Sequence, residues 1–155
     1  MKRFLSTVAI LATIGCAGSL SADESRTESV EFLNSGKLLS ANLPFSEAVR
    51  VDNTLYLSGR IGIVPETMRL APGGIREETR QTMENIKRSL DAHGYSMSDI
   101  VKCAVMLADI DEWGTFNEVY ASFFSNRYPA RSVFGVSGLA LGARVEVECI
   151  AAASR

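Results

Sequence analysis

Two charged side chains in the C-terminal part of the chain, Arg131 and Glu146, are of types suited to binding or catalysis. A guanidinium keeps its charge in a pocket and can grip a carboxylate through two parallel hydrogen bonds. An ordinary glutamate is ionised at neutral pH, so it can accept a proton from water or pair with an arginine. Residue type alone leaves other roles open. Arg131 can make a surface salt bridge, and Glu146, which alternates with apolar residues between Arg144 and Glu148, can be solvated or can line a subunit interface.

The cysteines and the single histidine do not form a recognisable site. His93 and the cysteines at 16, 103 and 149 show no CxxC or HExxH spacing, so the sequence predicts no metal site. Cys103 and Cys149 lie in β-like runs without the neighbouring histidine or helix N-terminus that a reactive thiolate needs. Because a bridge between neighbouring strands needs restrictive geometry, we expect two buried free thiols. His93 is expected to be a surface residue that complements a helix dipole.

The first 22 residues are typical of a secretory signal peptide. Lys2 and Arg3 precede an apolar run, Phe4–Gly15, that is too short to cross a bilayer as a helix, and small residues follow it. The sequence therefore predicts cleavage of residues 1–22 and export, for example to a bacterial periplasm. Because Ile14-Gly15-Cys16 partly resembles a lipobox, a lipoprotein anchored through Cys16 is an alternative. The polar residues 23–36 are expected to be a flexible leader.

The charge of the exported chain argues against a nucleic-acid partner. The whole chain has a net charge of −2, and removing Lys2 and Arg3 with the signal peptide changes it to −4. No Lys/Arg cluster is present that could neutralise a phosphate backbone.

The remaining residues, 37–155, have the length and patterning of a single α+β domain. The order ββαβαββ predicts a mixed sheet with both helices on one face, and oligomerisation is expected to cover the other face. Gly59 interrupts a strand, which often marks a bulge or a close approach. The expected strands are 37–41, 48–51 and 54–59 (the last two around an Asp52-Asn53 turn), 100–107, 131–136 and 143–151, and the expected helices are 76–93 and 112–124.

Three of these elements have predicted buried surfaces. The strand 100–107 is a continuous apolar run, which predicts burial on both faces. Each helix carries an apolar stripe at helical spacing. The stripes are Ile75, Thr79, Met83, Ile86 and Leu90 in the first helix, and Trp113, Phe116, Tyr120 and Phe123/Phe124 in the second.

A series of short patches occurs in an order that is typical of one family. The C-terminal patch is the most specific, because Pro129-Ala130-Arg131-Ser132 is followed by an apolar stretch and then by Val145-Glu146. The chain resembles the RidA (reactive intermediate deaminase, YjgF) family over residues 37–152. The other matching patches are Pro44-Phe45-Ser46, Leu57-Ser58-Gly59-Arg60-Ile61, Arg80–Ile86, Asp99–Lys102 and Asn117–Phe124.

The resemblance implies a fold and an activity. It implies a chorismate-mutase-like sheet assembled into a homotrimer, with clefts between subunits. The implied activity is hydrolysis of 2-iminobutanoate, 2-iminopropanoate and related enamines to 2-keto acids and ammonia, without a cofactor. It assigns the substrate carboxylate to Arg131, which fixes the imine carbon for attack by water, and it assigns positioning of that water to Glu146. The other implied site residues are Phe45, Ser58, Gly59, Asn117 and Val133.

Departures from the family pattern keep a second hypothesis open. Phe45 replaces a frequent tyrosine, Val133 replaces a frequent cysteine, and Arg60 replaces a frequent glutamine. A phenol as proton donor and a thiol mechanism are therefore excluded at these positions. The alternative is a non-catalytic homologue that binds small carboxylates or acts as a chaperone. An RNA-cleaving translation inhibitor, an older label in the family, fits poorly with an acidic, exported chain that has one histidine.

Overall fold

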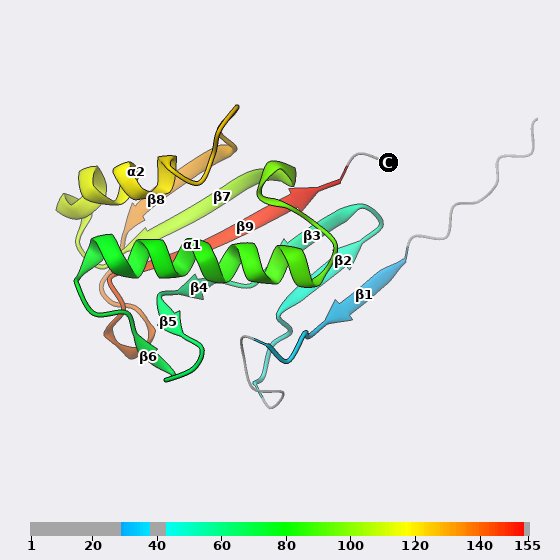
Figure 1. Cartoon of the computed structure of the whole chain (residues 1–155), viewed down its shortest axis with the longest axis horizontal. Coiled ribbons are helices and arrows are strands. Elements are labelled where there is room, and N and C mark those ends of the chain that lie inside the picture. Colours follow the sequence, from blue (N-terminus) through cyan, green and yellow to red (C-terminus); the bar gives the residue numbers. More distant parts are fainter. Residues whose placement is uncertain (1–28, 38–42, 154–155) are drawn as a thin grey trace, which may run out of the picture.

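The computed structural model describes residues 29–37 and 43–153 of the chain. The predicted signal peptide, Cys16 and most of the expected strand 37–41 lie outside these residues. Figure 1 shows one mixed sheet crossed by two helices. Its strand order is β1-β2-β3-β9-β7-β8, and the short β4 also pairs with β9. The seven strands are β1 (Val30–Leu33), β2 (Ala48–Val51), β3 (Thr54–Leu57), β4 (Arg60–Ile61), β7 (Ile100–Leu107), β8 (Ala130–Gly135) and β9 (Val145–Ala152).

The connections follow from local sequence signals. β2 and β3 form a hairpin around Asp52-Asn53, where Asp52 adopts the positive φ that short hairpin turns need. A separate hairpin of β5 (Ile63–Val64) and β6 (Arg69–Leu70) occupies the loop before the first helix. The described strands pair antiparallel except β7 and β8, which are parallel and joined by a helical crossover. The predicted ββαβαββ order is thus the framework of the fold, with β1 and the short strands β4, β5 and β6 added to it.

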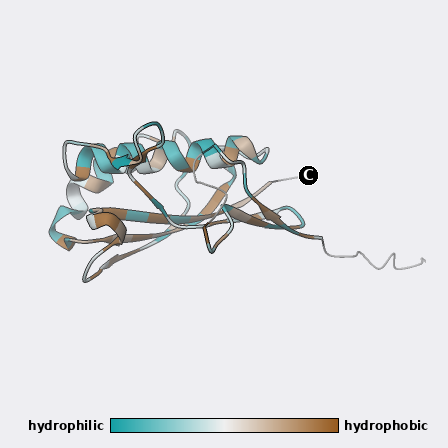
Figure 2. Cartoon of the chain, turned by 90° about the horizontal axis from the view of Figure 1, so that it is seen from below, coloured by the Kyte–Doolittle hydropathy of each residue, from teal (hydrophilic) through white to brown (hydrophobic). Residues whose placement is uncertain are grey.

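The first helix, α1 (Ile75–Ala92), packs its predicted stripe against the sheet. Ile75, Thr79, Met83, Ile86 and Leu90 are all buried, as their spacing predicts. They meet the sheet face that carries alternate residues of the central strands, including Val105 and Val147. Figure 2 shows both helices on this one face of the sheet and none on the other, which confirms the predicted layering.

The second helix, α2 (Trp113–Ala121), is shorter than expected. Phe123 and Phe124 of the predicted stripe lie beyond its end, where they are partly buried against the core. A 3-10 turn, Ile110–Glu112, precedes it, and the Asp109 carboxylate caps that turn by accepting from the backbone N–H of Asp111. Phe116 and Tyr120 are buried, but Trp113 is 49% exposed. The stripe prediction was therefore wrong for Trp113, which lines an open hollow together with Arg131 and Val133 of the edge strand β8.

Two expectations about the sheet need correction. β7 is buried on one face only, since Cys103, Val105 and Leu107 are buried while alternate residues are half-buried. Its second face belongs to the bare side of the sheet. In addition, the leader 23–36 was expected to be flexible, yet residues 30–33 of it form β1, which pairs along its whole length with β2. Charged residues in that segment hid the strand, because an edge strand exposed on one side tolerates them.

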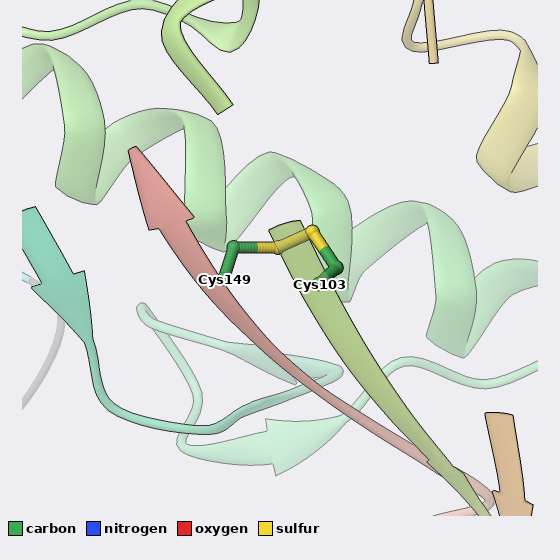
Figure 3. The surroundings of a disulfide bond; sticks show 2 residues. All are labelled: Cys103 and Cys149. Atoms are coloured by element: carbon green, nitrogen blue, oxygen red, sulfur yellow. A yellow bond between two sulfur atoms is a disulfide. The ribbon is translucent and has the colours of Figure 1, made fainter. Parts of the chain in front are cut away.

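Cys103 and Cys149 form a disulfide, contrary to the expected pair of free thiols (Figure 3). They are direct partners in the antiparallel register of β7 and β9, with their Cα atoms 4.1 Å apart. Such closely spaced cross-strand pairs bring side chains on the same face together. Both cysteines are buried beneath α1. The sequence shows that each lies in a strand but not that the two strands are neighbours in this register, which is why the prediction was wrong.

The expectation that His93 is a surface residue is also wrong, because its side chain is only 8% exposed. Its Nε2 atom lies 3.6 Å from Oε1 of the buried Glu47. The same carboxylate accepts hydrogen bonds from the Ser89 hydroxyl and from the Ser35 hydroxyl and backbone N–H. Burial alone would raise the pKa of Glu47, but these hydrogen bonds and the nearby Arg60 guanidinium lower it overall. A buried carboxylate thus links the end of α1 to the segment after β1.

Candidate functional site

The Arg131 side chain projects from an edge strand toward α2. β8 ends the sheet, and Arg131 pairs in register with Cys103, whose side chain is on the helix face. The guanidinium Nη2 donates a hydrogen bond to the Asn117 Oδ1 atom at 2.7 Å. The guanidinium carbon also lies 4.6 Å from the centroid of the Tyr120 ring and 5.5 Å from that of Phe116. One turn of α2 therefore supplies both the amide and the aromatic rings that orient Arg131.

The charge of Arg131 is not neutralised by an ion pair in the described part of the chain. None of the salt bridges among residues 29–37 and 43–153 includes it. Burial raises the pKa of the Tyr120 phenol to about 12, against a smaller opposite effect of Arg131, so this ring stays neutral. Among the described residues, none holds Arg131 in the surface salt bridge that the alternative reading required. Arg131 is oriented by neutral groups and keeps its charge available for an anion.

Two hollows flank Arg131 in the groove between α2 and β8. One has a volume of about 310 Å³ and is lined by Asn117, Tyr120, Ala121, Tyr128, Pro129 and Arg131. The other has a volume of about 410 Å³ and is lined by Ile110, Trp113, Arg131 and Val133. Since Arg131 belongs to both, an anion bound to its guanidinium has room on either side. Asn117 and Val133 thus lie in the Arg131 groove, as expected.

Glu146 occupies the opposite face of the sheet. Its neighbours Val145 and Val147 are buried on the helix face, so the strand alternation directs Glu146 to the bare face, where it is half-buried. Its carboxylate lies directly over Gly59, because a β-carbon built on that glycine would collide with Oε1 of Glu146. The close approach predicted at Gly59 is therefore confirmed, and the group that approaches is the Glu146 side chain.

Burial raises the pKa of Glu146, and the charge of Glu148 two residues along raises it further. A raised pKa brings a carboxyl group closer to the pH range in which it can both accept and return a proton. A carboxylate that acts as a general base in an active site needs such a raised pKa.

Ser58 directly precedes Gly59 and connects it to the segment that contains Phe45. The Ser58 hydroxyl donates to the Ser46 carbonyl at 2.7 Å, and the Ser58 backbone N–H donates to the Glu47 carbonyl. These bonds hold the loop of Phe45 and Ser46 against the strand that leads into Gly59. The Phe45 ring is 49% exposed, so it is available for contact with another molecule.

The predicted site residues therefore form two groups in one chain. The first group, Arg131, Asn117 and Val133, lies in the groove of α2 and β8. The second group, which is Phe45, Ser58, Gly59 and Glu146, lies around the β4 end of β9. Because β7 separates β8 from β9 and the two charged side chains point to opposite faces, one chain does not bring Arg131 and Glu146 together.

Tyr120 and Trp113 are neighbours of Arg131 that sequence reasoning missed as site residues. It placed both in the core stripe of the second helix. Tyr120 follows Asn117 by three positions and Trp113 precedes it by four, so all three share one side of α2. That spacing was the available signal.

Metal binding and membrane insertion are not features of the described residues. Within residues 29–37 and 43–153, no three side chains of His, Cys, Asp or Glu are grouped in a way that could hold a metal ion. None of the helices in that part of the chain combines the length and the apolar character needed to cross a bilayer.

Comparison with known proteins agrees with this architecture. A family model described as endoribonuclease L-PSP matches residues 36–153. The chain belongs to this family, which is the RidA family. A RidA structure from an Antarctic Psychrobacter bacterium is 38% identical, with a TM-score of 0.74 over 79% of this chain and 99% of that one. The expected RidA fold, a mixed sheet with two helices on one face, is therefore confirmed.

Two further RidA relatives carry names that bear on chemistry. A mouse protein named 2-iminobutanoate/2-iminopropanoate deaminase is 44% identical over 108 residues, which are 70% of this chain and 80% of that protein. The structure of TdcF from E. coli, solved with bound serine, is 31% identical, with a TM-score of 0.74 over 80% of this chain and 99% of that one.

Proposed function

We propose that this RidA protein hydrolyses 2-imino acids and their enamine tautomers to 2-keto acids and ammonia, without a cofactor. The observation that carries the proposal is Arg131, an arginine oriented by Asn117 and Tyr120 in a groove and not neutralised by a described carboxylate. A small carboxylate is the ligand that such a fork recognises. The mouse deaminase and the serine-bound TdcF are relatives whose names fit a substrate of this size and charge.

The proposed reaction needs only binding, water and proton transfer. The substrate carboxylate binds Arg131, which fixes the adjacent C=N carbon. Water adds to that carbon, one of its protons passes to Glu146 as the C–O bond forms, and Glu146 returns this proton to the nitrogen to give a carbinolamine. Glu146 then accepts the remaining hydroxyl proton as the C=O bond forms and returns it to the nitrogen as the C–N bond breaks, so that one imine and one water give one keto acid and one ammonia. None of these steps uses a phenol at position 45 or a thiol at position 133, so Phe45 and Val133 are compatible with activity.

A homotrimer with sites between subunits supplies the geometry that one chain lacks. Arg131 and Glu146 are on opposite faces of one sheet, so a site that contains both needs groups from two copies. Strand alternation directs Tyr56 and Phe134 to the bare face, where they are exposed and a second copy can cover them. We therefore place Arg131 and Asn117 of one protomer opposite Glu146, Ser58 and Phe45 of the next.

The test is the fate of imines generated in the cuvette by an amino-acid oxidase. An added nucleophile that traps free imine competes with hydrolysis, so the rate of trapping reports the imine that remains. We expect the protein to lower trapping and to release ammonia in proportion to its concentration. A folded, trimeric preparation that leaves the trapping rate at its spontaneous value for all imines would refute the deaminase proposal.

The raised pKa of Glu146 predicts the pH dependence of this activity. The ionised carboxylate accepts the proton of water, so activity is lost as pH falls through the pKa of Glu146 and returns above it. Because this pKa is raised, the acid limb lies at higher pH than for an ordinary glutamate. Glu148→Gln removes the neighbouring charge that raises this pKa, so the limb is expected to move to lower pH.

This shift is measured from kcat/KM between pH 4 and 8, roughly the range that spans an ordinary and a raised glutamate pKa, after subtraction of spontaneous hydrolysis. Glu84→Gln, which removes an exposed carboxylate on the outer side of α1, is the matched control and is expected to leave the limb in place. A limb that does not move in Glu148→Gln would argue that Glu146 is not the titrating group.

We also propose that the protein is exported and that residues 1–22 are removed. The Cys103–Cys149 disulfide supports this location, because buried disulfides persist in oxidising compartments and are rare in the cytosol. In a bacterial host we expect the periplasmic fraction to contain a chain that begins at Asp23, as measured by intact mass. The intact Met1 form in the cytosol would contradict export. A diacylated chain starting at Cys16 in the membrane fraction would instead establish the lipoprotein form.

A further inference from the structure

The short strand β4 carries a buried arginine behind the backbone on which Glu146 rests. Arg60 is 3% exposed and pairs in register with Val147, whose side chain is on the helix face. Its neighbour Gly59 lies under the Glu146 carboxylate on the bare face. Because consecutive residues of an extended chain point to opposite faces, the Arg60 guanidinium and the surface beneath Glu146 are two sides of one short segment.

Arg60 contacts two other elements through one nitrogen atom. Its Nη2 donates hydrogen bonds to the Ser89 hydroxyl of α1 at 2.9 Å and to the carbonyl of Glu47, directly before β2, at 3.1 Å. The same Nη2 lies 3.7 Å from Oε1 of the Glu47 carboxylate, which also accepts from the Ser89 hydroxyl at 2.6 Å. These three side chains form a closed, buried cluster that joins β4 to α1 and to the start of β2 (Figure 1).

The backbone of Glu47 extends this cluster to both neighbours of Gly59. The Glu47 carbonyl accepts from the Ser58 backbone N–H at 3.2 Å as well as from the Arg60 guanidinium. Ser58 and Arg60 flank Gly59, so one carbonyl oxygen binds the residues on either side of that glycine. The position of Gly59 relative to the loop of Phe45, two residues before Glu47, therefore depends on the cluster.

Helix α1 holds the other end of the same segment. The Asn85 amide donates to the carbonyls of Ile61 at 3.1 Å and Ile63 at 2.8 Å. A β-carbon on Gly62 would lie only 2.7 Å from the backbone carbonyl oxygen of Glu78, so this glycine permits direct contact between β4's continuation and the helix backbone. The chain beneath Glu146 is thus fixed to α1 on both sides.

Two buried charges are an unusual means of holding a strand. Burial lowers the pKa of the Arg60 guanidinium and the charge of Glu47 opposes that effect, so each charge supports the other. A further basic group, His93, has its Nε2 atom 3.6 Å from the same Oε1 of Glu47. Well-packed apolar residues often stabilise a core at least as well as a buried ion pair does. Unlike an apolar contact, however, the ion pair and its hydrogen bonds are satisfied in one geometry only.

We propose that the buried pair of Glu47 and Arg60 is a positioning pair, which holds the backbone at Gly59 where Glu146 can transfer protons. This inference rests on the proposed function, because it uses Glu146 as the base. Both side chains are buried between the sheet and α1, so they act on the reaction only through the groups that they hold. Misplacement of a reacting group by about 1 Å can lower a rate by about 100-fold.

The experiment is a double-mutant cycle at Glu47 and Arg60, measured as kcat/KM in the imine-trapping assay. Arg60→Gln and Glu47→Gln each leave one buried charge without its partner, so each is expected to lower kcat/KM by roughly tenfold or more. Glu47→Gln/Arg60→Gln has neither charge and two amides that can hydrogen-bond, so it is expected to recover most of the wild-type value. Inhibition by the 2-keto acid product, which reports the Arg131 grip, is expected to be unchanged throughout.

The acid limb of the pH profile separates positioning from a general loss of stability. Burial is the main cause of the raised pKa of Glu146, and the backbone at Gly59 lies against its carboxylate. Retreat of that backbone admits water, so the limb is expected to move to lower pH in each single variant and to return in the double variant. Glu148, the neighbouring charge, is present in all of them. Arg88→Gln, which removes an exposed arginine next to Ser89, is the matched control and is expected to change neither quantity.

The outcomes distinguish this inference from the proposed function. Folded, trimeric single variants with wild-type kcat/KM and an unmoved acid limb would overturn the inference and leave the deaminase activity in place. A double variant as slow as the single variants, or a loss matched by weaker product inhibition, would equally overturn it. Should Arg60→Gln not fold, Arg60→Lys keeps the charge without the planar fork and is expected to show the same changes to a smaller extent. Absence of Arg131-dependent hydrolysis in the wild type refutes the proposed function itself.

Discussion

Replacing Arg131 by alanine is expected to lower kcat/KM for imine hydrolysis by roughly 100-fold or more, because the substrate loses the bidentate anchor that fixes its reacting carbon. Arg131→Lys keeps a positive charge but lacks the planar fork, so it is expected to restore only a small part of the activity. The Asn117 hydrogen bond and the Tyr120 stacking show that the guanidinium is oriented for this task before any ligand binds. The measurement is the imine-trapping assay, with circular dichroism to confirm folding.

Arg127→Ala is the matched control for this variant. Arg127 is an exposed arginine four positions earlier, and its described hydrogen bond is to the backbone carbonyl of Ser98. Removing it takes away the same charge from the same region of the chain without touching the Arg131 groove, so activity is expected to stay within about twofold of the wild type, as is usual for surface changes of well under 1 kcal/mol. Activity of Arg131→Ala at the level of Arg127→Ala would contradict the carboxylate role of Arg131.

The same pair of variants separates the deaminase from a chaperone-like homologue. A chaperone recognises exposed apolar surface of its clients, so Arg131→Ala would leave client protection intact and there would be no imine hydrolysis to lose. A deaminase loses ammonia release in this variant alone. The rate of imine hydrolysis therefore distinguishes a deaminase from a chaperone-like homologue, whereas a binding signal does not.

Sequence patterning predicted the elements whose packing is local. The α1 stripe could be predicted because residues at helical spacing must share a face, and all five of its members are buried. The Asp52-Asn53 hairpin could be predicted because the turn chemistry is encoded in the turn itself. Family motifs then identified the residues of the Arg131 groove, although spacing alone would have left Arg131 in a surface salt bridge.

The predictions that proved wrong depend on which segments become neighbours. Trp113 carries the same apolar signal as Phe116, but Phe116 packs in the core and Trp113 lines an open hollow beside β8. His93 looks like a helix-end surface residue until Glu47, 46 positions away, is placed beside it. The opposed faces of Arg131 and Glu146 likewise follow from the register of β7, β8 and β9, which no local pattern encodes.

The Cys103–Cys149 disulfide in the core is expected to stabilise the folded protein. Cys103 and Cys149 are separated by 46 positions in the sequence, so the disulfide closes a long loop in the unfolded chain. A loop of that length gives about 4 kcal/mol of stabilisation in the chain-entropy model of a disulfide. We therefore expect the Cys103→Ala/Cys149→Ala double variant to be less stable than the oxidised wild type by about 2–4 kcal/mol, allowing for native-state adjustment.

Urea unfolding under oxidising and reducing conditions measures this difference, provided that both forms unfold reversibly. The reduced wild type and the double variant are expected to have similar midpoints, both below that of the oxidised protein, and thiol titration is expected to find free thiols at these positions only after unfolding in reductant. Equal midpoints in oxidised and reduced wild type, with two titratable thiols in the unfolded chain before reduction, would contradict the bridge. Cys103 is the register partner of Arg131, but β7 and β8 are also paired at the five other positions between Lys102 and Leu107. The folded double variant is therefore expected to keep its imine hydrolysis. In that case the disulfide stabilises the fold and takes no part in the chemistry of the groove.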